Sequence, residues 1–160
     1  MLSCKDSDKF QSKNADDRVV FHRDDIETLR DSARTAGAKI NTKPWASMTT
    51  DVWHVDYVLL PDTVLRYNLW EGYWLNLEDD YTYTFGQYSD TLEFGYYRYD
   101  LDDGILRMYP LLGDRGITEW KVLTNGEMTI LVNTGRYSLQ GYQIKLYRKR
   151  GLPQRPTTSD

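Results

Sequence analysis

The stretch YTYTFGQYSDTLEFGYYRYD, residues 81 to 100, places six tyrosines and two phenylalanines in twenty positions. Its first half alternates aromatic residues with threonine, which is the period of a β-strand. A Ser-Asp-Thr turn at 89–91 interrupts this alternation, and a second aromatic run follows it. The stretch therefore predicts two adjacent antiparallel strands, at 81–88 and 92–99. It also raises the question of which rings fill a core and which contact a ligand.

Similar short runs of strand-forming residues flank this pair, separated by turn residues at close spacing. The expected strands are 52–59, 73–77, 81–88, 92–99, 104–109, 117–123, 127–132 and 141–148. Asn125-Gly126 is the strongest turn signal, because this dipeptide supplies the two positive φ angles of a type I′ hairpin. About eight strands are enough to close a small barrel. The predicted fold class is mainly all-β, an antiparallel meander closing into a roughly eight-stranded barrel, with one N-terminal amphipathic helix.

The residues before the strands predict one helix. Residues 1–17 carry too little apolar surface to offset the entropy of ordering, so a disordered tether is expected there. Asp24 and Asp25 precede apolar residues at helical spacing and Gly37 is a natural stop, which predicts a helix at about 25–36. The expected divisions of the chain are a tether at 1–17, a helix-bearing segment at 18–51, the barrel at 52–150 and a disordered tail at 151–160.

The composition is that of a single, mildly acidic, soluble domain. A chain of 160 residues is long enough for one core and too short for two comfortable ones. The net charge of −4 argues against a nucleic-acid partner, and no run of eighteen apolar residues could span a membrane. The basic residues near the C-terminus are expected to form a solvated strand edge and tail: Lys145, Arg148, Lys149, Arg150 and Arg155.

Few residues offer chemistry. No pattern brings His22, His54 and the single cysteine, Cys4, together as a catalytic triad or a metal site. The acidic turn at 100–104 has glycine at its fifth position, where a calcium loop needs it at the sixth, so it predicts a hairpin turn. The sequence therefore predicts no catalytic residue, no metal and no cofactor.

Both faces of the second aromatic strand carry rings, so its inward face has to be chosen. Gly86 and Gly95 are candidates for bulges or for close approach of another strand. We expect the following side chains to fill the interior: Tyr81, Tyr83, Phe85, Leu92, Phe94, Tyr96, Leu106, Met108, Trp120, Val122, Met128, Ile130, Ile144 and Leu146. Tyr97 and Tyr99 would then stay exposed, either as a cross-strand packing pair or as a contact surface. The predicted ligand contacts are Tyr97, Tyr99, Tyr83, Phe94 and Trp120.

The first residues resemble the end of a lipoprotein signal. In MLSC (1–4) a small residue precedes a cysteine, as in the bacterial lipobox, and KDSD (5–8) resembles the charged stretch after the lipidated cysteine in surface-exposed lipoproteins of Bacteroidetes. The resemblance implies lipidation of Cys4 and a location in the bacterial cell envelope, as an outer-membrane lipoprotein held to the membrane only through its lipid anchor. A cytoplasmic protein with an incidental cysteine is the alternative.

Gly-Tyr-Trp at 72–74 opens the row of closely spaced strands, and the last strand places Arg148 on the same face as its apolar residues. These features resemble the calycin superfamily, specifically the lipocalin-like domains of bacterial lipoproteins, over about residues 70–150. In that family Gly-x-Trp begins the first barrel strand, and an arginine of the last strand packs over the tryptophan to plug the closed end. The resemblance implies that Trp74 is the plug and Arg148 its partner.

Together these features predict a non-enzymatic cell-envelope lipoprotein whose lipocalin-like barrel binds a small apolar or aromatic ligand at one open end. The alternative is a carbohydrate- or protein-interaction module that uses exposed tyrosine and tryptophan residues as stacking platforms. A third class, an enzyme using carboxylates at the barrel mouth, would need an acidic pair with shifted pKa values in a cleft. A hollow interior would favour the first class, and a filled interior with tyrosines outside would favour the second.

Overall fold

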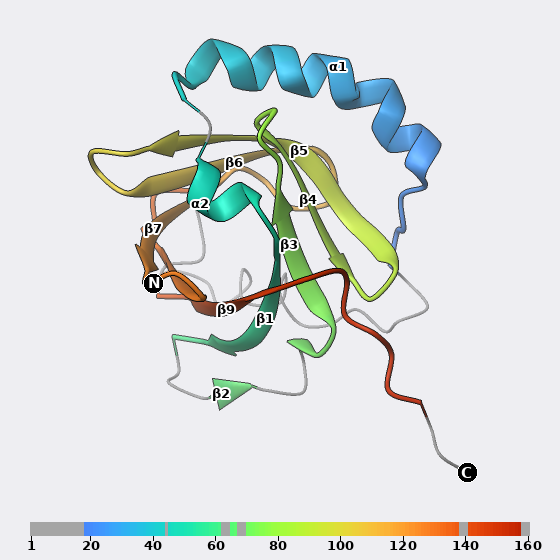
Figure 1. The fold of residues 1–160 in the computed structure, drawn as a ribbon, viewed down its shortest axis with the longest axis vertical. Helices are drawn as coiled ribbons and strands as arrows, with labels where there is room; N and C mark the ends of the chain where they lie inside the picture. Colours follow the sequence, from blue (N-terminus) through green and yellow to red (C-terminus); the bar gives the residue numbers. More distant parts are fainter. Residues whose placement is uncertain (1–17, 44, 62–64, 67–69, 138–140, 158–160) are drawn as a thin grey trace, which may run out of the picture.

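The computed structural model of the protein describes residues 18–43, 45–61, 65–66, 70–137 and 141–157 (Figure 1). The expected tether at 1–17, with Cys4, lies outside these ranges. Within the described ranges, no helix is long and apolar enough to cross a membrane.

Two helices and nine strands make up the described chain. They are α1 (Arg23–Ile40), α2 (Ala46–Thr49), β1 (Val52–Leu59), β2 (Leu65–Arg66), β3 (Tyr73–Leu77), β4 (Thr82–Gln87), β5 (Asp90–Asp100), β6 (Ile105–Leu112), β7 (Thr118–Thr124), β8 (Met128–Asn133) and β9 (Gln143–Lys149). Each of the predicted strands overlaps one of these, because alternating side chains and turn residues mark both their course and their ends. The two-residue strand β2 was not predicted.

The strands form an antiparallel meander that closes on itself. Neighbours follow the order β1, β3, β4, β5, β6, β7, β8, β9, and β2 pairs with the far end of β1. Strand β9 pairs back with β1, from Val52 opposite Lys149 to Leu59 opposite Gln143, and this pairing closes the ring. The prediction of a mainly all-β, eight-stranded antiparallel barrel with one N-terminal helix is confirmed.

Two glycines allow the aromatic strands to bend. The ladder between β4 and β5 shifts register at Gly86, and the ladder between β5 and β6 shifts at Gly95. A Cβ on Gly86 would lie 2.3 Å from the carbonyl oxygen of Asp90, and one on Gly95 would lie 2.1 Å from that of Tyr109. Both predicted bulges are confirmed. At each one, the neighbouring backbone lies closer to the glycine than a side chain on that residue would permit.

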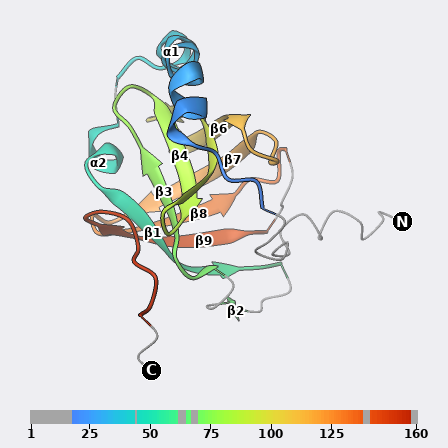
Figure 2. The ribbon, with the colours of Figure 1, turned by 90° about the vertical axis from the view of Figure 1, so that its right-hand side faces the viewer.

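Helix α1 lies across the outside of the barrel, in contact with β4, β5 and β6, and Figure 2 shows it almost end-on. Ile26 and Ala33 on its inner face are buried against Phe94 of β5. The helix continues past its predicted end because Gly37 faces the barrel, where an added Cβ would lie 2.6 Å from the Tyr81 Cβ. The prediction of Gly37 as a helix stop was wrong, since this glycine provides room for a close contact.

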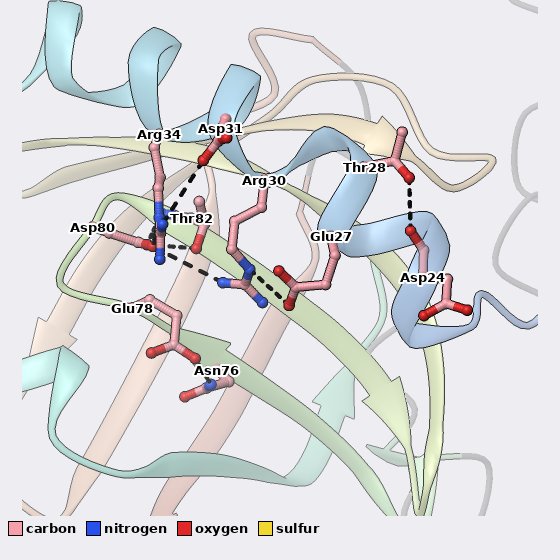
Figure 3. A network of polar contacts seen from close by, with 10 residues as sticks. All are labelled: Asp24, Glu27, Thr28, Arg30, Asp31, Arg34, Asn76, Glu78, Asp80 and Thr82. Atoms are coloured by element: carbon pink, nitrogen blue, oxygen red, sulfur yellow. Dashed lines mark hydrogen bonds and ion pairs between the residues drawn. The ribbon is translucent and has the colours of Figure 1, made fainter.

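A polar network also attaches α1 to the barrel, at the turn between β3 and β4 (Figure 3). Arg34 Nε donates a hydrogen bond to Asp80 Oδ2 at 2.5 Å, and Arg30 Nη1 lies 3.9 Å from the same oxygen. The other oxygen of Asp80 accepts hydrogen bonds from the Thr82 amide at 3.0 Å and from its hydroxyl at 2.5 Å. Burial acts to raise the pKa of the Asp80 carboxyl, but the hydrogen bonds from Thr82 and Arg34 lower it below its ordinary value.

Replacing Asp80 with asparagine is expected to lower the free energy of unfolding at pH 7 by about 1 kcal/mol, the usual value of a hydrogen bond to a charged group near a surface. Because the folded pKa of Asp80 is lowered, its contribution is present above about pH 4 and is lost as the pH falls through the folded pKa. Denaturant unfolding should therefore show a difference between the two proteins at pH 7 that disappears near about pH 2. Asp31→Asn, at an almost fully exposed neighbour of Arg34, should change nothing measurable.

The short helix α2 lies across one opening of the barrel, which we name the α2 end (Figure 1). Trp53, at the start of β1, is fully buried there, and its indole N–H donates to the Met48 carbonyl at 2.9 Å. Arg148 of β9 holds its guanidinium carbon 5.2 Å from the centre of the Trp53 ring and donates to the Ser47 carbonyl. An arginine and a tryptophan on paired strands therefore close this end together with α2.

The predicted pairing of Trp74 with Arg148 was wrong. Trp74 points out of the barrel, because its neighbours along β3 belong to the interior core and strand side chains alternate. Its indole N–H donates to the Tyr88 carbonyl at 2.8 Å, and its ring lies against Gly86, where a Cβ would approach within 2.5 Å. The tryptophan beneath Arg148 is Trp53, because the barrel begins at β1 and not at β3.

The choice of inward face on β5 was also wrong. Tyr97 is fully buried in the interior, where its hydroxyl donates to the Glu78 carbonyl at 2.8 Å. Tyr99 is half-buried and stacks on Trp45, with ring centres 3.4 Å apart. Phe94 lies on the outer face, beneath α1. Because the core covers one face of β5 and the helix covers the other, both sets of rings are buried, and the predicted exposed pair of tyrosines does not exist.

The hairpin between β7 and β8 is present, but its turn is not of type I′. Gly126 has a φ of +91°, whereas Asn125 is not among the residues with positive φ, and the Asn125 N–H donates to the Met128 carbonyl at 3.1 Å. The inward-facing positions of β8 are therefore shifted by one residue from the prediction. Its buried side chains are Thr129, Leu131 and Asn133 rather than Met128 and Ile130.

Candidate functional site

The end of the barrel opposite α2 carries a buried ion pair between Arg115 and Glu93. Strand β4 turns into β5 there, β8 ends there, and the loop 113–117 joins β6 to β7. Arg115 extends from this loop to Glu93 and Phe85, which are paired residues of β5 and β4. We name this region the Arg115 end.

A buried polar network occupies the Arg115 end. Arg115 Nε donates to Glu93 Oε2 at 2.6 Å, and the Tyr83 hydroxyl donates to Glu93 Oε1 at 2.6 Å. The side chains of Glu93 and Arg115 are 5% and 16% exposed, and Tyr83 is fully buried. Removing such a pair from water costs several kcal/mol per ion unless both partners are well bonded. Both carboxylate oxygens of Glu93 are bonded, so the carboxylate is fully accommodated.

Local features of the sequence position this network. Phe85 lies opposite Glu93, and Tyr83 lies opposite Gly95, in the ladder between β4 and β5, so alternation turns all of these residues toward the interior. Gly113 has a φ of +127°, and a Cβ there would lie 2.9 Å from the Cγ of Glu93. The glycine therefore lets the loop pass close enough for Arg115 to reach the carboxylate.

The charges of the network are fixed by its surroundings. Burial, and then the negative charge of Glu93, raise the pKa of the Tyr83 hydroxyl well above its ordinary value, so Tyr83 remains a hydrogen-bond donor. Burial acts to lower the pKa of the Arg115 guanidinium, but Glu93 raises it by more, and the net shift is upward. Arg115 is therefore positively charged at every pH at which the protein is folded.

A row of aromatic rings continues from this network. The guanidinium carbon of Arg115 lies 4.3 Å from the centre of the Phe85 ring. The Tyr73 ring centre lies 5.6 Å from that of Phe85, and the Trp70 ring centre lies 5.2 Å from that of Tyr73. These distances are typical of aromatic and cation–π contacts. The Arg115 end therefore combines flat apolar surfaces with the positive charge of Arg115, and Arg18 donates to the Tyr73 hydroxyl at 3.3 Å at the edge of the same row.

Three buried side-chain nitrogen atoms at this end have no hydrogen-bond partner among the described residues. They are Nη2 of Arg115, Nδ2 of Asn133 and Nε of Arg18, whose Nη1 donates to the Tyr73 hydroxyl at 3.3 Å. Asn133 is the last residue of β8 and is 6% exposed, and its Oδ1 accepts a hydrogen bond from the Gly135 N–H at 2.8 Å. That bond fixes the orientation of the amide and leaves Nδ2 as the atom without a partner.

The middle of the barrel is filled by side chains. The largest fully buried ones among the described residues include Trp53, Trp120, Tyr83, Tyr97, Leu77, Leu106, Leu131 and Leu146. Two shallow depressions on the described surface lie outside the barrel, beside α1. A ligand in the interior would therefore have to bind near an end rather than in a deep central cavity.

The outer face offers a second aromatic surface. Tyr96 of β5 stacks on Tyr109 of β6, with ring centres 4.9 Å apart and planes within 7°. A shallow depression of about 600 Å³ is lined by one side of α1 and by Tyr96. Tyr137 is 43% exposed. The prediction that Tyr96 fills the interior was wrong, because Tyr96 packs with Phe94 in the cluster beneath α1.

Tyr83 is the predicted ligand contact that belongs to the Arg115 network. Trp120 is inside the barrel as predicted, and its indole N–H donates to the Thr118 hydroxyl at 3.0 Å. Tyr97 and Tyr99 contact the residues of the α2 side, and Phe94 lies outside. Glu93, Arg115 and Asn133 were not among the predicted site residues. Glu93 shares a face of β5 with Gly95 and Tyr97, and its charge would have been noticed only if that face had been identified as the inward one.

Neither histidine joins a reactive cluster. His22 is the N-cap of α1, and His54 Nε2 lies 2.8 Å from the Gly151 carbonyl oxygen. Among the described residues, no group of three or more His, Cys, Asp or Glu side chains is placed to hold a metal ion. No protein-family model matches this chain, and no curated protein matches it either.

Proposed function

We propose that this chain is a non-enzymatic binding protein with a lipocalin-like barrel that holds a small aromatic ligand at the Arg115 end. The closed meander of eight strands supports the lipocalin-like assignment. So does the α2 end, where an arginine of the last strand packs over a tryptophan of the first. This is the contact that the resemblance to calycins implies, made by Trp53 and Arg148 instead of Trp74 and Arg148.

One observation carries the ligand-binding part of the proposal. The Arg115 guanidinium lies on Phe85 at the end of a barrel whose core is mainly apolar. A well-packed apolar core is often as stable as, or more stable than, one containing a buried ion pair, so stability alone does not require this charge. The neighbouring rings of Tyr73 and Trp70 extend the flat surface. A fixed cation beside aromatic faces suits a planar ligand better than a long apolar chain.

Binding of a neutral aromatic probe tests this proposal. N-phenyl-1-naphthylamine, which becomes fluorescent in apolar surroundings, is expected to bind the protein saturably. Phe85→Leu keeps most of the apolar volume and removes the ring, so it should weaken this binding about fivefold, the value of one aromatic contact. The measurement is a fluorescence titration of each purified protein.

Phe94→Leu provides the matched control. It makes the same substitution at a ring that is fully buried, but on the outer face beneath α1. Probe binding should be unchanged in this variant. Equal weakening by both substitutions, or probe fluorescence that never saturates, would contradict binding at the Arg115 end.

The second candidate function is an interaction module that binds a carbohydrate or protein on the outer face. It is favoured by the stacked Tyr96 and Tyr109 rings beside the depression along α1, and by the filled interior. The same titration separates the two candidates. If Tyr109→Leu weakens probe binding and Phe85→Leu does not, the outer face is the binding surface.

We also propose that the protein is a lipoprotein of the bacterial cell envelope, on the basis of the lipobox-like residues 1–4. In a bacterial host, the full-length protein is expected to incorporate an alkyne-labelled fatty acid, and Cys4→Ser should abolish this labelling. Detection of the label after gel electrophoresis is the measurement. A wild-type protein that takes up no label, or a serine variant that keeps it, would leave the cytoplasmic alternative.

A further inference from the structure

The hydrogen-bond donors at the Arg115 end are not all used by the protein. Glu93 engages the Nε side of the Arg115 guanidinium, and its other oxygen is taken by the Tyr83 hydroxyl. Nη2 of Arg115 is buried and has no partner among the described residues. Guanidinium groups characteristically bind planar anions through two parallel N–H donors. The carboxylate of Glu93 therefore leaves part of the binding capacity of Arg115 unfilled.

A second unused donor comes from the next strands of the same end. Asn133 lies opposite Trp120 in the ladder between β7 and β8, and Arg115 precedes β7 by only a few residues. Asn133 has its carbonyl oxygen bonded to the Gly135 amide, but its Nδ2 has no partner in the described part of the chain. Its side chain belongs to the inward set of β8, together with Thr129 and Leu131.

Unpaired buried donors are rare in folded proteins because each one costs about 1 to 3 kcal/mol, and more when the group is charged. Arg148 Nε at the α2 end and Arg18 Nε are also unpaired, but Arg115 and Asn133 are inward-facing residues of one end, where a hydrogen-bond acceptor from a ligand could serve both. Both groups are donors only at the atoms concerned, and one of them carries a positive charge. The complementary ligand group is an oxyanion, such as a carboxylate.

We propose that the ligand at the Arg115 end is a small aromatic acid, whose ring lies against Phe85 and Tyr73 and whose oxyanion accepts hydrogen bonds from Nη2 of Arg115 and Nδ2 of Asn133. This inference rests on the proposed function and deepens it. Charge is balanced in the empty network, because Glu93 neutralises Arg115. The bound acid is held by hydrogen bonds to a cation that already has one partner, so its affinity depends on both donors.

Two probes with the same rings separate this inference from the proposed function. They are 8-anilinonaphthalene-1-sulfonate, which carries an oxyanion, and N-phenyl-1-naphthylamine, which lacks it. The wild-type protein should bind the sulfonate about tenfold more tightly than the neutral probe, as expected for a hydrogen bond to a charged group in a buried site. Fluorescence titrations at equal ionic strength give both affinities.

Two substitutions remove one donor each and keep the fold. Arg115→Lys retains a cation for Glu93 but loses Nη2, and Asn133→Leu replaces the unpaired amide by an apolar group of similar volume. Each is expected to reduce the preference for the sulfonate over the neutral probe to about threefold or less. Because Asn133 is not part of the aromatic surface, Asn133→Leu should also leave the affinity for the neutral probe unchanged. Because Asn133→Leu also removes the acceptor of the Gly135 N–H, thermal melting is measured to show that the variant is still folded.

Arg107→Lys is the matched control, because Arg107 makes the same Nε contact with a buried glutamate, Glu119, on the outer face. It should leave both affinities unchanged. Equal binding of the two probes by the wild type, or an undiminished preference in Arg115→Lys and Asn133→Leu, would overturn the inference while the proposed function stands. Absence of binding by both probes would overturn the inference and the proposed function together.

Discussion

Replacing Gly95 with alanine is expected to lower the free energy of unfolding by about 3 kcal/mol, the upper end of what overpacking costs in a protein core. The added Cβ would lie 2.1 Å from the Tyr109 carbonyl oxygen and 2.9 Å from the Pro110 Cα. Both are backbone atoms of the neighbouring strand, so no side chain can turn away to make room. Strands β5 and β6 would have to separate at the bulge and lose ladder hydrogen bonds. Urea unfolding followed by tryptophan fluorescence measures the loss.

Gly116→Ala is the control for the Gly95 substitution. Nothing lies within 4 Å of a Cβ at Gly116, and its φ is not in the left-handed region. Alanine there should change the free energy of unfolding by less than about 0.5 kcal/mol, or raise it slightly by restricting the unfolded chain. Equal stability of the two variants would show that β6 does not approach Gly95 as closely as the structure has it.

The order and type of the strands could be predicted because local signals determine them. In β4, aromatic side chains alternate with threonine, and turn residues follow the strand. Antiparallel neighbours joined by short turns then follow from chain order alone, since few other connections are possible. The closure between β9 and β1 is the one long-range step, and the number of strands was enough to suggest it.

The faces of β5 could not be predicted, because the sequence does not show what covers each side. Phe94 and Tyr97 are both fully buried, one by α1 and the other by the core, so the strand reads as aromatic on both faces. Gly37 gave the wrong helix end for the same reason. A glycine that ends a helix and a glycine that admits a neighbouring strand look alike until the neighbour is known.

The charged part of the candidate site could not be predicted from the sequence for a different reason. Arg115 and Glu93 are 22 residues apart and meet only because β6 turns back beside β5. Arg115 lies in a loop with glycines on both sides of it, where the residues give no strand or helix period to read. Tyr83 was predicted as a ligand contact because it is an inward aromatic residue, and its hydrogen bond to Glu93 required the structure.

Replacing Trp53 with leucine is expected to lower the free energy of unfolding by about 3 kcal/mol, as is usual when a buried aromatic side chain is cut back. Trp53 is fully buried at the α2 end, and the substitution removes both its packing and its hydrogen bond to Met48. Trp74→Leu should cost a similar amount, because Trp74 is 4% exposed and bonded to Tyr88. The single substitutions therefore do not show which tryptophan the last strand uses as its partner.

Double-mutant cycles with Arg148→Gln identify that partner. Arg148 lies opposite Trp53 in the ladder between β1 and β9, with its guanidinium over the indole ring. Their coupling energy should be about 1 kcal/mol, as expected for a partly desolvated cation–π contact. The cycle of Trp74 with Arg148 should be additive to within about 0.5 kcal/mol. Coupling at Trp74 and none at Trp53 would restore the pairing predicted from Gly-x-Trp, and would mean that β3 rather than β1 begins the ring.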